Sequence, residues 1–358
     1  MAKRRLIPHL GGPLAVVLLA AWVGCTKEEH TMPAHVAGPT AELRPAARIQ
    51  FPAGTDSNSP AHWDRDRFFI FNSTGHPHRS FGASLTGLGK PEPVKYDNTV
   101  NGGRWMEATW PSGDGTLYGW YHNEPGGLVP GTTLTAPKIG AARSKDNGAT
   151  WADLGIVLEA PPNTLKPDAQ NGYFAGGHGD FCVMLDERHQ MLYFLFGNYA
   201  GDVAEQGGAC ARMAWRDRDA PAGKVWKWHD GVWKQPGLGG HVTPVFGAFT
   251  AWERADCDAF WGPSVHWNTH LKQYVMLLNR ARGKGWVQEG IYVSFSTDVA
   301  DPMSWSEPEK IHNGGSWYPQ VIGTGEGLRG TDKLAGQTAR FFMGGVSDYE
   351  IVFSVPRR

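Results

Sequence analysis

A pattern of three β-strands recurs five times along the chain, and this repeat limits the possible folds more than any single motif. Each copy contains three runs of four to seven residues rich in Phe, Tyr, Trp, Val and Ile, separated by polar turns. No stretch of ten or more residues has a helical period. The predicted strands are 59–63, 67–71 and 80–85; 105–110, 117–122 and 139–144; 179–185, 191–196 and 208–214; 261–267, 274–279 and 290–296; and 317–322, 339–343 and 350–353. With an outer fourth strand in each copy, the repeat predicts an all-β, five-bladed β-propeller of about four antiparallel strands per blade, spanning residues 48–356.

The composition agrees with this fold and excludes other classes. The chain has 34 Lys and Arg against 35 Asp and Glu, so it lacks the excess of positive charge that nucleic-acid binding requires. Its 47 Gly and 25 Pro provide residues for turns, and its 16 Trp, 16 Phe and 10 Tyr provide material for a core. We expect a monomer with no nucleic-acid partner, no cofactor and no metal ion.

The first 24 residues are typical of an export signal. Lys3, Arg4 and Arg5 precede an apolar run at 13–23, which is shorter than the roughly 20 residues of a membrane span. The sequence AWVGC at 21–25 resembles a bacterial lipobox, although Trp22 replaces the usual Leu. This resemblance implies a lipid on Cys25 and a location in the cell envelope, and an ordinary secretory peptide cut nearby is the alternative. The proline-containing stretch 25–47 is predicted to be a flexible tether, the chain's only link to a membrane.

Three cysteines remain in the predicted propeller. An odd number allows at most one internal disulfide, and no pair has the spacing of zinc ligands. Cys182 lies in an apolar run and is predicted to be a buried strand residue. A bridge between Cys210 and Cys257 is the more plausible pairing.

The sequence SKDNGATW at 144–151 resembles the Asp box of sialidases and other propellers. In such a turn Asp146 would bond its own backbone, Gly148 would take a positive φ, and Trp151 would pack between sheets. We therefore expect these residues to stabilise an outer turn, far from any active site.

A more specific resemblance covers roughly residues 50–355. The sequence DSNSP at 56–60, with RFFIF at 67–71, resembles the first blade of the glycoside hydrolase family 43 and 32 superfamily. The sequence FWGPSV at 260–265, with YVMLL at 274–278 and GIYVS at 290–294, resembles its fourth blade. The resemblance implies a carbohydrate-active enzyme, a glycoside hydrolase whose partner is an oligo- or polysaccharide.

The same resemblance implies catalytic carboxylates at the starts of the inner strands. Asp56 matches the position of the base or nucleophile, and Asp180 matches a carboxylate that holds the sugar and tunes the acid. The chain departs from the family at Trp261, because many members have a Glu directly before Gly-Pro. Glu289 and Glu107 are the two candidates for the missing general acid, and a slip of one residue in register would turn Glu107 into the sheet.

Further side chains are expected to bind the substrate. Flat rings near inner-strand starts can stack on sugar faces, and histidines on the same rim can bind sugar hydroxyls. The glycines around Asp180 suggest close approach of a ligand to the backbone. The expected substrate-binding residues are Trp105, Trp261, Trp317, Tyr318, His178 and His76.

Two other functions stay open. A propeller without the general acid, as Trp261 allows, would bind glycans without cleaving them. A sialidase-like enzyme, suggested by the Asp box, would need three arginines at the axis, where Arg104 is the only nearby candidate.

Overall fold

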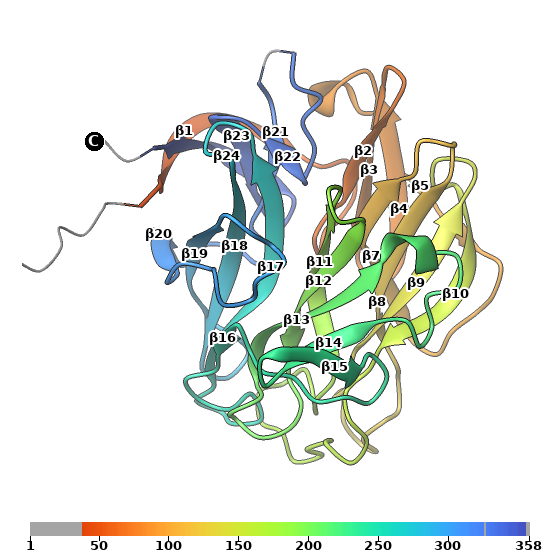
Figure 1. The fold of residues 1–358 in the computed structure, drawn as a ribbon, viewed down its shortest axis with the longest axis vertical. Helices are drawn as coiled ribbons and strands as arrows, with labels where there is room; N and C mark the ends of the chain where they lie inside the picture. The colour runs from red at the N-terminus through yellow and green to blue at the C-terminus, as the bar shows by residue number, and fades with distance from the viewer. Residues whose placement is uncertain (1–37, 326, 356–358) are drawn as a thin grey trace, which may run out of the picture. The chain divides into compact units, whose positions relative to one another are not determined.

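The computed structural model describes residues 38–325 and 327–355, and the predicted export signal lies outside these residues. Five antiparallel sheets follow one another around a common centre (Figure 1). This arrangement confirms the predicted five-bladed β-propeller. The only helical turns in the described residues are η1 (Leu85–Gly87) and η2 (Trp215–Asp217), and no helix there is long and apolar enough to span a bilayer.

Each blade starts with its innermost strand and runs outward. The first blade is β2 (Ala61–Asp64), β3 (Arg67–Ser73), β4 (Pro77–Gly82) and β5 (Glu92–Pro93). The second is β7 (Gly103–Pro111), β8 (Leu117–Glu124), β9 (Lys138–Ser144) and β10 (Thr150–Leu158), with β6 (Lys95–Tyr96) at its edge. The third is β11 (His178–Asp186), β12 (Met191–Asn198), β13 (Gly207–Ala214), β14 (Trp226–His229) and β15 (Val232–Pro236), with β16 (Phe246–Gly247) beside β13.

The last two blades complete the ring. The fourth is β17 (Asp258–Asn268), β18 (Gln273–Arg282), β19 (Gln288–Ser296) and β20 (Glu309–Asn313), and β22 (Leu334–Ala335) pairs with β17 on its inner side. The fifth is β21 (Gln320–Gly323), β23 (Thr338–Met343), β24 (Val346–Ser354) and β1 (Thr40–Gln50).

The outermost strand of the fifth blade comes from the other end of the described chain. β1 pairs antiparallel with β24, joining Thr40 to Ser354. The predicted tether at 25–47 is therefore too long, because its last residues form a strand. β1 escaped prediction because it is an edge strand with few buried side chains and contains Pro45, which edge strands tolerate.

The hydrophobic core is divided among the interfaces between blades. Phe71 packs on Trp151 between the first two blades, and Trp120 packs on Phe194 between the second and third. Phe51 stacks on Phe342 where the fifth blade meets the first. Because both faces of a blade are covered, strands such as β12 are buried along almost their whole length.

The turn at 144–151 has the geometry expected from its sequence. Asp146 Oδ1 accepts hydrogen bonds from the Ser144 hydroxyl and the Thr150 amide, at 2.7 and 2.9 Å. Gly148 has φ +80°, and a Cβ there would lie 2.3 Å from the ring of Phe71. Trp151 is buried, so this turn is structural.

The cysteines do not form the predicted bridge. Cys182, Cys210 and Cys257 are all free and buried. Cys210 belongs to the core between the third and fourth blades, whereas Cys257 lies in an aromatic cluster with Trp252 and Trp261. The pairing was wrong because sequence spacing does not reveal which core each sulfur enters. Cys182 is buried in a strand, as predicted.

Candidate active site

Three inner strands carry a β-bulge near their first residues. The register shifts between Met106 and Ala108 in β7, between Gly179 and Phe181 in β11, and between Trp261 and Ser264 in β17. A bulge inserts an extra residue and re-aims its side chain. The extra residues in β7 and β11 are Glu107 and Asp180, two of the predicted catalytic residues.

These bulges bring Glu107 and Asp180 together with His122, which lies near the end of β8. One donor atom from each of the three lies within 4.8 Å of the others. Asp180 has φ +46°, an uncommon conformation for a residue other than glycine, so the surrounding contacts hold it in place. All three side chains are buried.

Hydrogen bonds from the third and fifth blades fix the two buried carboxylates. Asp180 accepts hydrogen bonds from the hydroxyls of Tyr199 and Tyr318, at 2.5 and 3.0 Å. Glu107 Oε2 accepts the amide of Phe181 at 2.8 Å. The cluster therefore ties the second blade to the third and the third to the fifth.

His122 links the buried carboxylates to solvent. Its Nδ1 lies 3.3 Å from Glu107 Oε1 and 3.0 Å from the Asp180 amide nitrogen, and its Nε2 lies 3.1 Å from Glu124 Oε1. In the neutral form of His122 the Asp180 N–H requires a lone pair on Nδ1, which favours the tautomer with the proton on Nε2, facing Glu124. The Glu124 side chain is 30% exposed, so the chain of contacts runs from a buried acid to an accessible one.

Asp56 is the other accessible carboxylate of this group. It lies in the loop before β2, is solvent-exposed, and its amide donates to Ser73 at 2.7 Å. Protein atoms around it still displace enough water to raise the pKa of Asp56 to about 6, and the charges of Asp180 and Glu124 add to this rise.

The buried members of the cluster are also shifted toward their protonated forms. Burial raises the pKa of Glu107 to about 7, although the hydrogen bond with His122 opposes the rise. Burial likewise raises the pKa of Asp180. For His122, burial lowers the pKa, but hydrogen bonds to Glu107 and Glu124 outweigh it and raise the pKa well above its usual value. Glu107 and His122 together therefore hold at least one proton at neutral pH.

Glu107, His122 and Asp180 are also the residues that could hold a metal ion. Oxygen and imidazole donors suit several divalent ions. However, both Asp180 oxygens accept tyrosine hydroxyls, Glu107 Oε2 accepts an amide, and both His122 nitrogens have partners. A bound ion would have to displace several of these contacts.

Glu289 does not have the environment of a general acid. Its carboxylate forms an ion pair with Lys310 and accepts the Tyr292 hydroxyl at 2.7 Å, both from its own blade. Burial alone would raise the pKa of Glu289, but these two hydrogen bonds outweigh it and lower the pKa. A lowered pKa is the opposite of what protonating a leaving group requires.

Two predicted substrate contacts are wrong because the side chains are fully buried. Trp261 packs edge-on against Trp286 and Trp317 inside an aromatic cluster. His178 Nε2 lies 2.8 Å from Lys227 Nζ, and burial, followed by the Lys227 charge, lowers the pKa of His178 well below its usual value. Neither can reach a sugar.

The other predicted contacts have different outcomes. Tyr318 is buried, and its hydroxyl donates a hydrogen bond to Asp180 instead of facing a ligand. His76 is exposed, but its Nε2 lies 3.1 Å from the Val94 carbonyl oxygen at the edge of the first blade. Trp105 and Trp317 are half-buried and keep part of each ring accessible. Trp105 packs edge-on against His122 and so lies next to the cluster.

The glycines around Asp180 make room for the protein itself. A Cβ on Gly179 would lie 2.5 Å from His122 Cε1, and one on Gly177 would lie 2.5 Å from Pro137 N. The expectation of a ligand against this backbone was therefore wrong, because the imidazole and a proline occupy the space.

Sequence reasoning missed His122 and Tyr199 and gave Glu124 no role. The only available signal was the His-Asn-Glu run at the end of the second strand of the second blade, on the rim that Asp56 shares. It also missed Asn58, whose Nδ2 donates to the carbonyls of Phe181 and Pro263, both at 2.9 Å. Asn58 thereby joins the first blade to the third and fourth.

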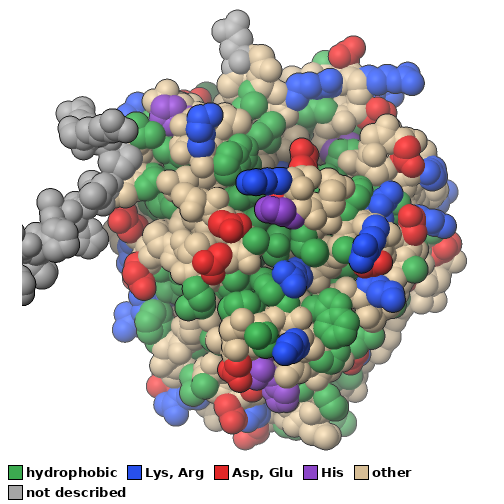
Figure 2. Space-filling view, in the orientation of Figure 1, with side chains coloured by type: hydrophobic (Ala, Val, Ile, Leu, Met, Phe, Trp, Pro, Cys, Tyr) green, Lys and Arg blue, Asp and Glu red, His purple; other side chains and the backbone are tan. Residues whose placement is uncertain are grey.

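Arg104 does not form the arginine site of a sialidase. Its guanidinium bonds Asp153 at 2.7 Å and stacks on Tyr96 and Tyr121, with centroid distances of 4.0 and 4.8 Å. It is buried within the second blade. On the face shown in Figure 2, acidic and basic side chains are interspersed among hydrophobic ones.

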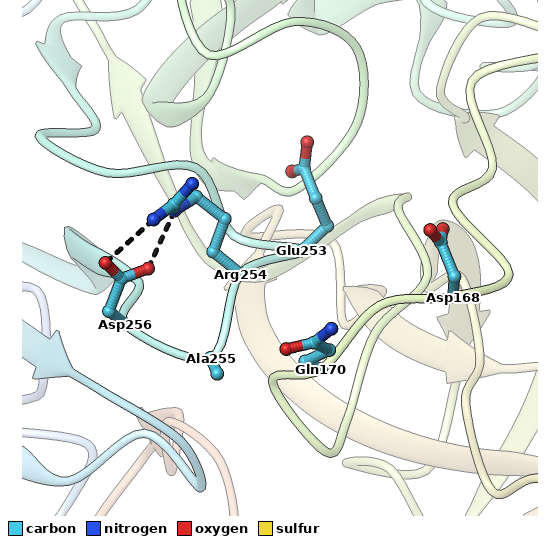
Figure 3. Close-up of a pocket in the computed structure, with 6 residues that line it drawn as sticks. All are labelled: Asp168, Gln170, Glu253, Arg254, Ala255 and Asp256. Carbon is cyan, nitrogen blue, oxygen red and sulfur yellow. Dashed lines mark hydrogen bonds and ion pairs between the residues drawn. The ribbon is translucent and has the colours of Figure 1, made fainter.

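A separate hollow of about 510 Å³ lies among loops (Figure 3). Glu253, Arg254 and Asp256 line one part of it, facing Asp168 and Gln170. Arg254 and Asp256 form an exposed ion pair with each other, at 2.7 and 2.9 Å. None of the predicted catalytic residues lines this hollow.

No family model and no curated protein matches the chain. Solved structures with a similar fold include an endo-arabinase from Bacteroides thetaiotaomicron, with 12% identity and a TM-score of 0.51. That match covers 87% of this chain and 96% of the other. An exo-1,5-α-L-arabinanase from a bovine ruminal metagenomic library has 13% identity and a TM-score of 0.50, covering 84% and 94%. At these identities the similarity is one of fold, and the chain shares the five-bladed β-propeller of both enzymes.

Proposed function

We propose that this protein is an exported glycoside hydrolase acting on an oligo- or polysaccharide. The observation that carries the proposal is the adjacent buried pair Glu107 and Asp180, with Asp56 close enough for the charge of Asp180 to raise its pKa. Glycosidases need one carboxyl group to protonate the leaving oxygen and another to activate water or attack carbon. Raised pKa values, such as those of Asp56 and Glu107, are typical of such groups.

Exposure separates the proposed roles. Asp56 and Glu124 are the carboxylates that a substrate can reach, since Glu107 and Asp180 are buried and hydrogen-bonded. In the proposal Asp56 is the base or nucleophile. Glu124 delivers a proton to the leaving oxygen and recovers it from His122 Nε2, while the Glu107 proton moves to Nδ1. The Asp180 amide fixes the resting tautomer of His122 and loses its hydrogen bond when Nδ1 takes up this proton.

The two similar structures suggest the first substrates to test. Both are named as enzymes that degrade arabinan, which makes linear arabinan the first polysaccharide in a screen. The basic and apolar segments before Cys25 support export to the cell envelope, with either a lipid at Cys25 or release of the mature protein.

One observation favours a second function. Trp261 occupies the position where the resembled superfamily often has its general acid, and it is buried. A propeller that binds glycans without cleaving them is the competing proposal.

A screen of arabinan, galactan, xylan and aryl-glycosides tests the first proposal. Asp56→Asn should lower turnover by about 10²-fold or more, because it removes the proposed base. His122→Gln should also lower turnover and should alter the pH profile. Glu289→Gln is the matched control and should leave turnover unchanged, because this carboxylate serves an ion pair. Binding of a polysaccharide without any release of reducing sugar would favour the competing proposal.

A further inference from the structure

A second pocket, of about 650 Å³, lies at the opposite ends of the inner strands from the carboxylates. Its lining includes the first three residues of β2, the last three of β7 and of β11, Trp267 of β17 and Leu334 of β22. These strands surround the centre of the propeller in Figure 1. Trp267 lines it six residues beyond Trp261, about 20 Å further along β17 at 3.3 Å per residue. We call it the distal pocket.

Aromatic rings form much of the wall of the distal pocket. Trp63, Trp110 and Trp267 come from three different blades, and each is only half-buried. Tyr274 packs edge-on against Trp267 with ring centroids 4.9 Å apart. Partly exposed rings of this kind offer flat apolar surfaces on which the C–H face of a sugar can stack.

Two buried polar atoms in the lining have no partner in the described residues. They are the hydroxyl of Thr109 and Nδ1 of His62, from side chains that are 1% and 2% exposed. Leaving such a group unpaired costs about 1–3 kcal/mol. Burial lowers the pKa of His62 to about 4, and its Nε2 faces Asn147 Oδ1 at 3.4 Å, so Nδ1 is left as an acceptor. Both atoms lie beneath the pocket wall, so a ligand hydroxyl would bond them only after a local shift of the side chains that cover them.

The charges around the distal pocket nearly balance. Arg188, Arg329 and Lys333 line it together with Asp186 and Glu187. Lys333 is also paired with the neighbouring Asp332, and Arg329 stacks on Trp63 at 5.1 Å. With three cations against two carboxylates, the lining has a formal net charge of only +1, which offers little attraction to a multiply charged anion.

We propose that the distal pocket is a second carbohydrate-binding site, which takes an uncharged sugar unit of an oligosaccharide. Its volume is in the range of small-molecule sites, and its walls offer aromatic rings for the apolar face of a sugar and charged side chains such as Glu187 and Arg188 for its hydroxyls. The site is independent of hydrolysis, because none of the axial carboxylates lines it.

Isothermal titration calorimetry on the chain carrying Asp56→Asn tests the proposal without turnover. The probes are arabinohexaose, xylohexaose, cellohexaose and mannohexaose. At least one should bind, and Trp267→Ala should weaken that binding about tenfold or remove one of two binding events. Thr109→Val keeps the shape of the side chain and should weaken binding about fivefold, the equivalent of one hydrogen bond. Trp226→Ala, on the exposed surface of β14, is the matched control and should bind as the parent does.

Two results would overturn the inference: no binding of any of the four probes, or binding that neither Trp267→Ala nor Thr109→Val changes. Thr109→Val guards against a folding defect in the tryptophan variant. Failure of the hydrolase proposal would look different, because the chain with Asp56 intact would then release no reducing sugar while these binding effects persisted.

Discussion

Replacing Asn58 with alanine should destabilise the propeller more than the small size of the asparagine side chain suggests. Asn58 is 4% exposed, and its amide donates to carbonyls of the third and fourth blades, both at 2.9 Å. Each hydrogen bond contributes about 1 kcal/mol, and each carbonyl left buried without a partner adds to the loss. We therefore expect Asn58→Ala to lower the free energy of unfolding by about 3 kcal/mol. At an unfolding entropy of about 2 cal/mol/K per residue, the melting temperature should fall by about 4–5 °C.

Two further variants make this test specific. Asn58→Asp should be worse than alanine at pH 8, where a carboxylate would face two carbonyl oxygens, and better at pH 5, where protonation restores a donor. Asn101→Ala removes an exposed asparagine that also bonds a carbonyl, that of Gly126, and should change stability by less than about 0.5 kcal/mol. Urea denaturation measures all three. The reasoning is refuted if Asn58→Ala unfolds at the same urea concentration as the parent.

Three other predictions concern the site and the export signal. The kcat/KM of the proposed hydrolase should rise as pH passes about 6, where Asp56 ionises, and fall above about 7, where Glu107 loses its proton; a flat profile from pH 5 to 8 would contradict these roles. Gly179→Ala should reduce kcat/KM at least tenfold, because its Cβ would displace the His122 ring, and normal kinetics in a folded variant would exclude that clash. Cys25→Ser should release the protein from the membrane fraction on cell fractionation, whereas an unchanged distribution would leave only a secretory signal.

The strands were predictable because blades covered on both faces produce continuous apolar runs. The run FCVML at 181–185, for example, lies within the buried strand β11. β1 was not predictable, since its pairing with β24 leaves one edge in solvent and most of its side chains exposed. Sequence pattern thus revealed burial between sheets and missed pairing at the edge.

The site was predictable only in part, because the sequence does not reveal where the register of the inner strands shifts. Asp56 and Asp180 were placed by their positions at strand starts, but the direction of each side chain depends on bulges that the sequence does not signal. The bulge at Glu107 turns it toward Asp180, whereas Trp261, at the edge of the bulge in β17, turns into the aromatic cluster. His178 and Glu289 likewise contact side chains of the protein, Lys227 and Lys310, instead of facing the site.

The pairing of β1 with β24 affects the order in which the chain can fold. A nascent polypeptide emerges with its N-terminus first, so β1 must wait for nearly the whole chain before its partner exists. Four blades can form from local contacts in that interval, while the fifth stays open and its edges remain unsatisfied. The exposed charges of Glu42 and Arg44 and the ring of Pro45 make β1 a poor template for a neighbouring molecule during this wait. Ring closure would then be the final step of folding. Until that step, the unpaired strand edges of the fifth blade are what a chaperone would need to shield.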